Sequence, residues 1–266
     1  MVRIAHEAPI SFFKQVRGRT DYDYALVHLF EESEEYYELF KTSLKEGREV
    51  VLDNSIFELG TAFDSTKFAQ WVNMLEPSYY IIPDALEDKD KTISNFDKWM
   101  DEYKGNLPGK TIAVVQGKTY GEIVECYKYL VNKVDKIAIS FDYSLFNLWT
   151  RHLSLPTKYH EWMVGRQMLL TRMIDDKVIN DKVPHHLLGC GLPQEFKAYR
   201  DYTFIDSLDT SNPIIAGIKR ICYSKEEGLQ DKPIEKLFTF INLKTTQEQE
   251  SDIIYNIFWF RKIVNG

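Results

Sequence analysis

The stretch Thr111-Ile-Ala-Val-Val-Gln116, with the helix-like segment 119–131 behind it, contains the pattern that decides the fold. An apolar run rich in Val and Ile that ends in a polar residue is typical of a strand buried on both faces. Seven further runs of this kind occur along the chain, over residues 3–7, 24–28, 49–53, 79–84, 136–140, 185–190 and 203–206. The segments between the runs predict helices, over 30–45, 65–75 and 92–103 as well as 119–131.

Strands that alternate with helices form βαβ units, and such units build a parallel sheet. Eight strands favour a (β/α)8 barrel over an open doubly wound sheet. We therefore expect a single barrel domain over residues 1–266. Its additions are a helical insertion at about 145–180 and C-terminal helices at about 232–266, where the segments 159–174 and 246–264 have helical spacing.

Composition limits the class of protein further. With 33 Lys and Arg against 40 Asp and Glu, the chain carries a net charge of -7, which argues against a general nucleic-acid coat protein. Cys126, Cys190 and Cys222 lack partners at zinc-ligand spacing, so we expect no metal site. No apolar run approaches the roughly 20 residues of a membrane helix, and the N-terminus lacks the apolar core of a signal peptide. These features predict a cytoplasmic protein without a membrane partner.

Polar side chains end one predicted strand after another. In a (β/α)8 barrel the active site lies at the carboxyl ends of the strands. The residues expected there are His6, Glu7, His28, Asp53, Asn54, Asp84, Gln116, Ser140, Asp142, Cys190 and Asp206. Any one of them alone can be explained as the cap of the following helix. As a set they predict a polar pocket at the mouth of the barrel.

Three carboxylates in this set, Asp53, Asp84 and Asp206, suggest a kind of chemistry. Carboxylates that converge in a partly desolvated pocket have their pKa values pushed apart, so that one attacks or accepts a proton while another donates one. Glycosidic-bond chemistry uses such a pair, with one carboxylate attacking C1′ of a sugar and holding it covalently.

Five motifs occur in a fixed order over about residues 50–210. They are Val51-Leu-Asp-Asn-Ser-Ile-Phe57, Ile81-Ile-Pro-Asp84, Val114-Val-Gln-Gly117, His186-Leu-Leu-Gly-Cys-Gly-Leu-Pro-Gln-Glu195 and Phe204-Ile-Asp-Ser207. In this order they resemble the motifs of the tRNA-guanine transglycosylase superfamily, a family of (β/α)8-barrel enzymes.

The resemblance assigns roles to individual residues. It implies that Asp206 is the nucleophile on C1′, with Asp209 as a rival, and that Asp53 is the general acid and base. It implies that Asp84 accepts hydrogen bonds from N1–H and the amine of a guanine-like base. The other residues expected at the substrate are Asn54, Gln116 and Gly117 near the base, Phe57 as a stacking ring or a core residue, and Gly189 and Gly191 beside the ribose or base.

The chain also departs from the family pattern. The zinc-binding Cys/His cluster is missing, the loop glycines after Asp53 are replaced, and the chain is shorter than the tRNA enzymes. It is therefore most similar to the zinc-free branch that modifies DNA with 7-deazaguanines, which phages and modification islands often encode. The resemblance implies exchange of guanine in DNA for a free base such as preQ0, without a cofactor, in the cytoplasm (the host's, for a phage protein).

Several alternatives stay open at this point. The polynucleotide could be tRNA, the enzyme could hydrolyse the bond instead of exchanging the base, or an inactive barrel could only bind nucleic acid. An aldolase-type barrel would need a Schiff-base lysine, for which Lys118 is the candidate. Basic residues are expected to contact phosphates, namely Lys14, Arg17, Arg19, Arg151, Lys158, Arg166, Arg172, Lys219 and Arg220, although each alone is also explained as solvated surface. The oligomeric state is left open.

Overall fold

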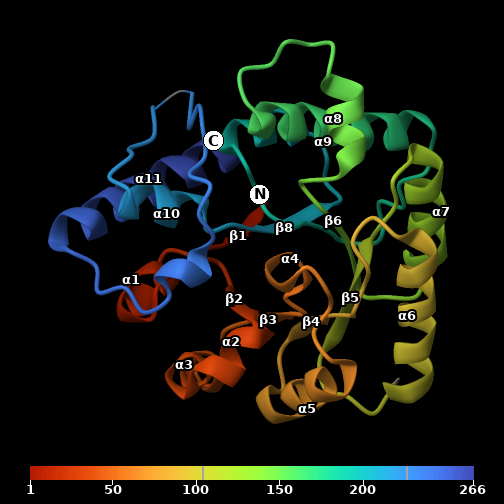
Figure 1. The fold of residues 1–266 in the computed structure, drawn as a ribbon, viewed down its shortest axis with the longest axis horizontal. Helices are drawn as coiled ribbons and strands as arrows, with labels where there is room; N and C mark the ends of the chain where they lie inside the picture. The colour runs from red at the N-terminus through yellow and green to blue at the C-terminus, as the bar shows by residue number, and fades with distance from the viewer. Residues whose placement is uncertain (104, 226) are drawn as a thin grey trace. The chain divides into compact units, whose positions relative to one another are not determined.

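The computed structural model describes residues 1–103, 105–225 and 227–266, and within them eight strands form one sheet. The strands are β1 (Arg3–Ala5), β2 (Asp23–Leu26), β3 (Val50–Asp53), β4 (Tyr79–Ile81), β5 (Lys110–Val115), β6 (Lys136–Ile139), β7 (His185–Leu187) and β8 (Ile205–Asp209). Their order is β1-β8-β7-β6-β5-β4-β3-β2. The strands are parallel, with helical segments between them, which confirms a nearly closed (β/α)8 barrel (Figure 1).

Helical segments connect the strands. The helices are α1 (Phe13–Arg17), α2 (Val27–Glu32), α3 (Glu34–Lys45), α4 (Ile56–Leu59), α5 (Ser65–Leu75), α6 (Lys89–Tyr103), α7 (Tyr120–Leu130), α8 (Ser144–Thr150), α9 (Lys158–Asp175), α10 (Asn212–Ile218) and α11 (Gln247–Asn265), and the 3-10 turns are η1 (Ile10–Phe12), η2 (Pro193–Tyr199) and η3 (Leu237–Phe240). The chain divides into two compact units. Unit 1 comprises Met1–Asp21, Phe141–Ile179 and Leu187–Gly266, and unit 2 comprises Tyr22–Ser140 and Asn180–His186.

Unit 2 contains helices that begin where the sequence predicted them. The Asp64 side chain accepts a hydrogen bond from the Lys67 amide (2.9 Å) and caps α5, while Thr119 and Glu122 form a capping box on α7. The expected continuous helix over 30–45 is wrong. Ser33 is extended and its hydroxyl accepts from the Tyr36 amide (3.2 Å), so α2 ends before it and α3 begins after it.

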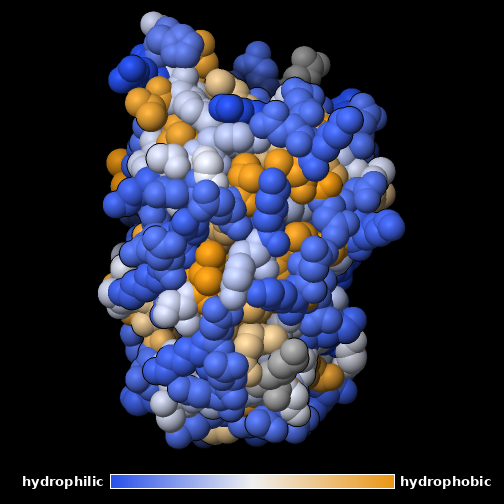
Figure 2. Space-filling model, turned by 90° about the vertical axis from the view of Figure 1, so that its right-hand side faces the viewer, coloured by the Kyte–Doolittle hydropathy of each residue, from blue (hydrophilic) through white to orange (hydrophobic). Residues whose placement is uncertain are grey.

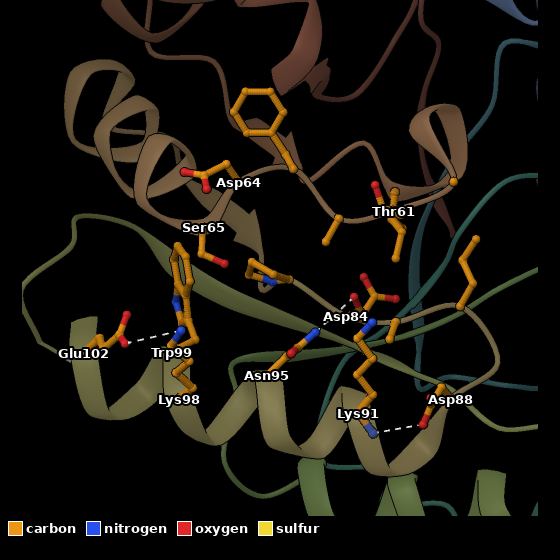
Figure 3. Close-up of a pocket in the computed structure, with 17 residues that line it drawn as sticks. Thr61, Asp64, Ser65, Asp84, Asp88, Lys91, Asn95, Lys98, Trp99 and Glu102 are labelled. Carbon is orange, nitrogen blue, oxygen red and sulfur yellow. Dashed lines mark hydrogen bonds and ion pairs between the residues drawn. The ribbon is translucent and has the colours of Figure 1, made fainter.

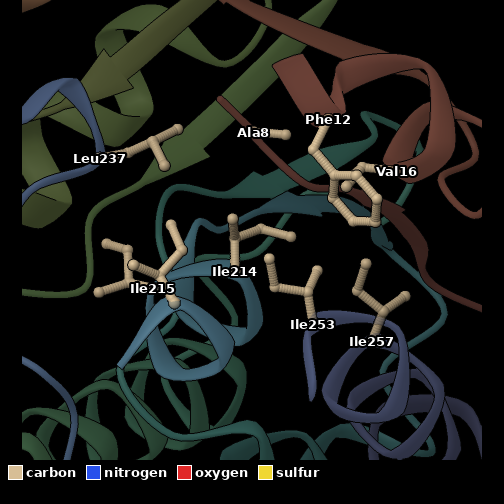
Figure 4. Close-up of a cluster of buried hydrophobic side chains, with 9 residues drawn as sticks. Ala8, Phe12, Val16, Ile214, Ile215, Leu237, Ile253 and Ile257 are labelled. Atoms are coloured by element: carbon tan, nitrogen blue, oxygen red, sulfur yellow. The ribbon is translucent and has the colours of Figure 1, made fainter. Parts of the chain in front are cut away.

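Unit 1 is held together by a cluster of buried apolar side chains (Figure 4). Its members come from η1, α1, α10, α11 and adjoining segments, and they are Ala8, Phe12, Val16, Ile214, Ile215, Ile218, Leu237, Ile253 and Ile257. Gly217 lets α10 and α11 approach closely, since a Cβ at this position would lie 2.6 Å from the Ile253 amide nitrogen. Because α10 follows β8, this packing fixes the C-terminal helix against the segment that leaves β8.

The bounds of β8 differ from the prediction, with a consequence for the candidate site. The strand begins at Ile205 and ends at Asp209, so the expectation that Asp206 ends its strand is wrong. Asp206 is the second residue, and its carboxylate forms an ion pair with Arg3 (2.8 Å) at the start of β1. The apolar-run criterion stopped at the first carboxylate, whereas pairing continues through Asp209 opposite Ala5. Asp209 is therefore the carboxylate at the carboxyl end of β8.

The two predicted additions to the barrel are present in part. Helices α8 and α9 form the insertion expected at about 145–180. Of the C-terminal helices expected at about 232–266, the described residues contain α11 and the short turn η3, and the chain between α10 and η3 is largely irregular.

In the part of the chain that the structure describes, none of the helices combines the length and the apolarity that a bilayer crossing requires. On the face that Figure 2 shows, hydrophilic residues predominate and hydrophobic residues form small patches. Patches of this kind are normal on folded proteins.

Candidate active site

The Asp84 carboxyl, just beyond β4 in unit 2, is the most deeply buried acid among the predicted site residues. It is 2 % exposed and accepts hydrogen bonds from Asn54 Nδ2 (2.8 Å) and Gln116 Nε2 (2.7 Å). Asn54 and Gln116 directly follow β3 and β5, the two neighbours of β4 in the sheet. Burial raises the pKa of Asp84 to about 6, although both amides oppose the shift. The structure thus brings together three residues that the sequence placed at the ends of neighbouring strands.

Both amides around Asp84 are fixed in orientation by the backbone. Asn54 Oδ1 accepts from the Ile56 amide (3.0 Å), and its Nδ2 also donates to the Ile82 carbonyl (3.1 Å). Gln116 Oε1 accepts from the Glu87 amide (2.9 Å). Each amide must therefore present its NH₂ group to the carboxylate. Gln116 is engaged at both ends of its amide, so its direct role is to hold Asp84.

A pocket of about 470 Å³ opens beside Asp84 (Figure 3). It is lined by the segment 60–65 before α5, by the segment 83–86 after β4, and by one face of α6. Its volume is typical of sites for small ligands. Carboxylates outnumber ammonium groups in the lining, which contains Asp64, Asp84, Asp88 and Glu102 against Lys91 and Lys98. The pocket therefore favours a ligand that presents hydrogen-bond donors over a ligand that presents phosphate.

Asp53 ends β3 and is held by two donors within unit 2. The Tyr24 hydroxyl donates to Oδ2, and the Ser55 amide donates to Oδ1 (2.5 Å). Ser55 adopts a left-handed conformation (φ 60°) directly before α4. The Tyr24 ring stacks on His186, with ring centres 6.0 Å apart. The carboxylate of Asp53 is thus held by hydrogen bonds and half-buried.

In unit 1, Asp209 lies at the carboxyl end of β8 and is nearly buried. Its Oδ1 accepts a hydrogen bond from the Gly189 amide (3.1 Å), which comes from the loop after β7. Gly189 has a positive φ of 63°, and a Cβ there would lie 2.5 Å from the Phe141 ring. Only glycine fits this position, so the loop brings a backbone donor to the Asp209 carboxylate.

The loop that holds Asp209 is itself fixed by a buried ion pair. Arg166 of α9 is 0 % exposed and forms two hydrogen bonds to the Glu195 carboxylate (2.6 and 3.0 Å). Two further donors reach the carbonyls of Leu188 (2.9 Å) and Gly189 (3.0 Å). The expectation that Arg166 is a surface residue for phosphates is wrong, because its guanidinium is fully buried and bonded inside unit 1.

His6, which follows β1, is a buried neutral imidazole near Asp209. Its Nδ1–H donates to the Thr210 carbonyl (3.1 Å), and burial lowers the pKa of the ring to about 4. Its Nε2 is buried and has no hydrogen-bond partner among the described residues. The ring packs edge-on against Phe260. His6 therefore supports the end of β1 through Thr210.

The other predicted substrate residues lie in three different settings. Gly117 allows the chain after β5 to pack closely against the first turn of α7, because a Cβ at this position would lie 2.9 Å from the Ile123 amide nitrogen. Phe57 is exposed on α4, so it is not a core residue. Gly191 lies against the Tyr159 ring, and its carbonyl accepts a hydrogen bond from Asn212.

Most of the basic residues predicted to bind phosphate are at the surface. Two of them are engaged in ion pairs, Lys219 with Glu235 and Arg220 with Asp252. Four others lie exposed or half-buried on α1 or near the ends of α1 and α8, namely Lys14, Arg17, Arg19 and Arg151.

Two residues of the site were missed by sequence analysis. Tyr24 lies inside a strand, where an aromatic residue is expected for packing alone. Lys232 lies in an irregular segment without a motif, and its ammonium is 5.3 Å from the centre of the Phe141 ring.

The described residues contain no group of three His, Cys, Asp or Glu side chains arranged to bind a metal ion. In comparisons with known proteins, no family model and no curated protein matches this chain.

Proposed function

We propose that this protein is a base-exchange transglycosylase that replaces guanine in a polynucleotide with a free 7-deazaguanine base. The main support for the proposal is the position of the Asp84 carboxyl. Two side-chain amides hold it beside a pocket whose lining is rich in hydrogen-bond acceptors. Guanine offers two adjacent donors, N1–H and the N2 amine, that match the two oxygens of a carboxylate.

The remaining carboxylates supply the two chemical roles of the proposed reaction. Asp209 attacks C1′, the C1′–N9 bond breaks, and its electron pair leaves with the guanine, which takes a proton from Asp53. The incoming base then gives its N9 proton to Asp53, attacks C1′ and releases the Asp209 carboxylate. We assign the attack to Asp209 and not Asp206, because Asp206 is three residues from the carboxyl end of β8 and is paired with Arg3.

The resemblance to the zinc-free branch of the transglycosylase superfamily favours DNA as the polymer. Zinc-dependent relatives act on tRNA, so tRNA is the matched alternative substrate. Hydrolysis is the alternative reaction, because water that enters the site can attack C1′ in place of the incoming base and leave an abasic sugar in the polymer. The lining of the Asp84 pocket, rich in acceptors, is suited to the free base in each of these cases.

A base-exchange assay tests the proposal. Duplex DNA, single-stranded DNA and tRNA are each incubated with the protein and preQ0, digested to nucleosides and analysed by mass spectrometry. We expect a 7-deazaguanine nucleoside in one polymer, and none with Asp84→Ala. The variant Asp101→Asn, an exposed change on α6, serves as the control and is expected to retain activity. Abasic sites instead of a new nucleoside would identify a hydrolase, and an unchanged polymer in all three cases would refute the proposal.

A further inference from the structure

Lys232 belongs to the irregular segment between α10 and α11 in unit 1. The segment is anchored shortly before it, because the Gln194 side chain donates to the carbonyl of the buried Leu229 (2.8 Å). The ammonium then lies 5.3 Å from the centre of the Phe141 ring and 5.9 Å from that of Tyr159. Lys232 as a residue is half-buried.

A chain of contacts connects this ammonium to Asp209. The Phe141 ring packs directly on Gly189, and the Gly189 amide donates to the Asp209 carboxylate (3.1 Å). The carboxylates whose charges act on Lys232 are those of Glu7, Asp142 and Asp209. They follow or end the strands β1, β6 and β8. The ammonium is therefore positioned at the carboxyl ends of these strands.

Among the described residues Lys232 forms no hydrogen bond and no ion pair, and the two aromatic rings offer it only their faces. An ammonium group has three donors, and polar groups in such surroundings normally have partners. Burial lowers the pKa of Lys232, while the surrounding carboxylates oppose that shift. A ligand that brings an anionic oxygen would supply the missing acceptor.

We propose that Lys232 binds the phosphate that flanks the sugar attacked by Asp209. This inference rests on the proposed function and names the part of the substrate that unit 1 recognises. Glu7, Asp142 and Asp209 repel a phosphate, and Lys232 offsets that repulsion where the sugar must lie. An ammonium is a compact point charge and suits a phosphate oxygen. Its contribution is to substrate binding, so its loss raises KM more than it lowers kcat.

Small ligands test this site without the need for catalysis. The probes are 2′-deoxyguanosine 5′-monophosphate and 2′-deoxyguanosine, which differ only in the phosphate. Surface amines are labelled with trinitrobenzenesulfonate, and the labelled lysines are located by mass spectrometry. We expect the nucleotide to protect Lys232 and the nucleoside to leave it reactive. Lys244, an exposed lysine of the segment before α11, is expected to react equally in all samples.

Two variants complete the experiment. Lys232→Met is expected to weaken nucleotide binding about tenfold to a hundredfold and to leave nucleoside binding unchanged, whereas Lys244→Met binds both as the wild type does. For an oligonucleotide, Lys232→Met is expected to reduce the slope of log affinity against log salt by about 0.7 to 0.9.

The outcomes separate this inference from the proposed function. If the nucleotide fails to protect Lys232, or if Lys232→Met binds it as the wild type does, the phosphate site is refuted. If Lys232→Met instead lowers kcat with a displaced pH profile and an unchanged salt slope, Lys232 acts on Asp209, which also refutes it. Protection by the nucleotide in a protein that exchanges no base would support the phosphate site and refute the transglycosylase.

Discussion

The buried carboxyl of Asp84 makes the stability of the fold depend on pH, and Asp84→Asn removes this dependence. Burial raises the pKa from the ordinary value of 3.8 to about 6 in the folded protein. The folded state therefore binds this proton more tightly than the unfolded state does. The contribution of Asp84 to the free energy of unfolding is fully present below pH 3.8 and is lost as the pH rises through about 6.

The size of the effect follows from the two pKa values. A difference of about 2 pH units, at about 1.4 kcal/mol per unit, corresponds to about 3 kcal/mol. Two histidines act in the opposite direction. The pKa values of His6 and His185 are lowered by burial to about 4, below the ordinary 6.5, so their contributions to stability increase as the pH rises through this range. Only the difference between wild type and variant isolates Asp84.

The assay is unfolding by urea, followed by tryptophan fluorescence at a series of pH values from 4 to 7.5. The wild type is expected to lose about 3 kcal/mol relative to Asp84→Asn as the pH rises. Asp101→Asn, which alters an exposed carboxylate on α6, is expected to give a flat difference. Asn54 and Gln116 are uncharged and do not titrate, so they add no pH dependence of their own. A flat difference for Asp84→Asn would refute the assignment of a raised pKa to this carboxyl.

Three further predictions concern unit 1. Asp209→Asn is expected to abolish a trapped sugar–enzyme adduct, whereas Asp206→Asn is expected to keep the adduct and to lose at most about 1 kcal/mol of stability. The adduct is detected by mass spectrometry of the intact protein, and the opposite result would reverse the assignment. Arg166→Met removes the partner of the buried Glu195 carboxylate and is expected to lower the free energy of unfolding by about 3 to 5 kcal/mol. Urea unfolding measures this change, and a loss below about 1 kcal/mol would contradict the expectation. Gly189→Ala is expected to lower the melting temperature of the protein more than Gly47→Ala does. Both glycines have a positive φ, but only a Cβ at position 189 would meet an aromatic ring within 4 Å. Equal losses of melting temperature would refute the steric argument.

The barrel and the positions of the polar residues in unit 2 were predictable from the sequence because both depend on burial. A strand covered on both faces must be apolar, and the first polar residue marks the point where that cover ends. Asp53, Asp84 and Gln116 stand at such points in unit 2, and the structure finds them there. The same criterion failed for β8, because pairing with β1 carries that strand past Asp206 to Asp209.

The surroundings of Asp209 in unit 1 depend on contacts between distant parts of the chain. Arg166 and Glu195 are 29 residues apart, and neither belongs to a pattern that predicts a buried pair. Lys232 lies in an irregular segment, where neither helical nor strand periodicity applies. Such residues acquire their roles from tertiary packing, so local sequence could indicate their charge but not their partners.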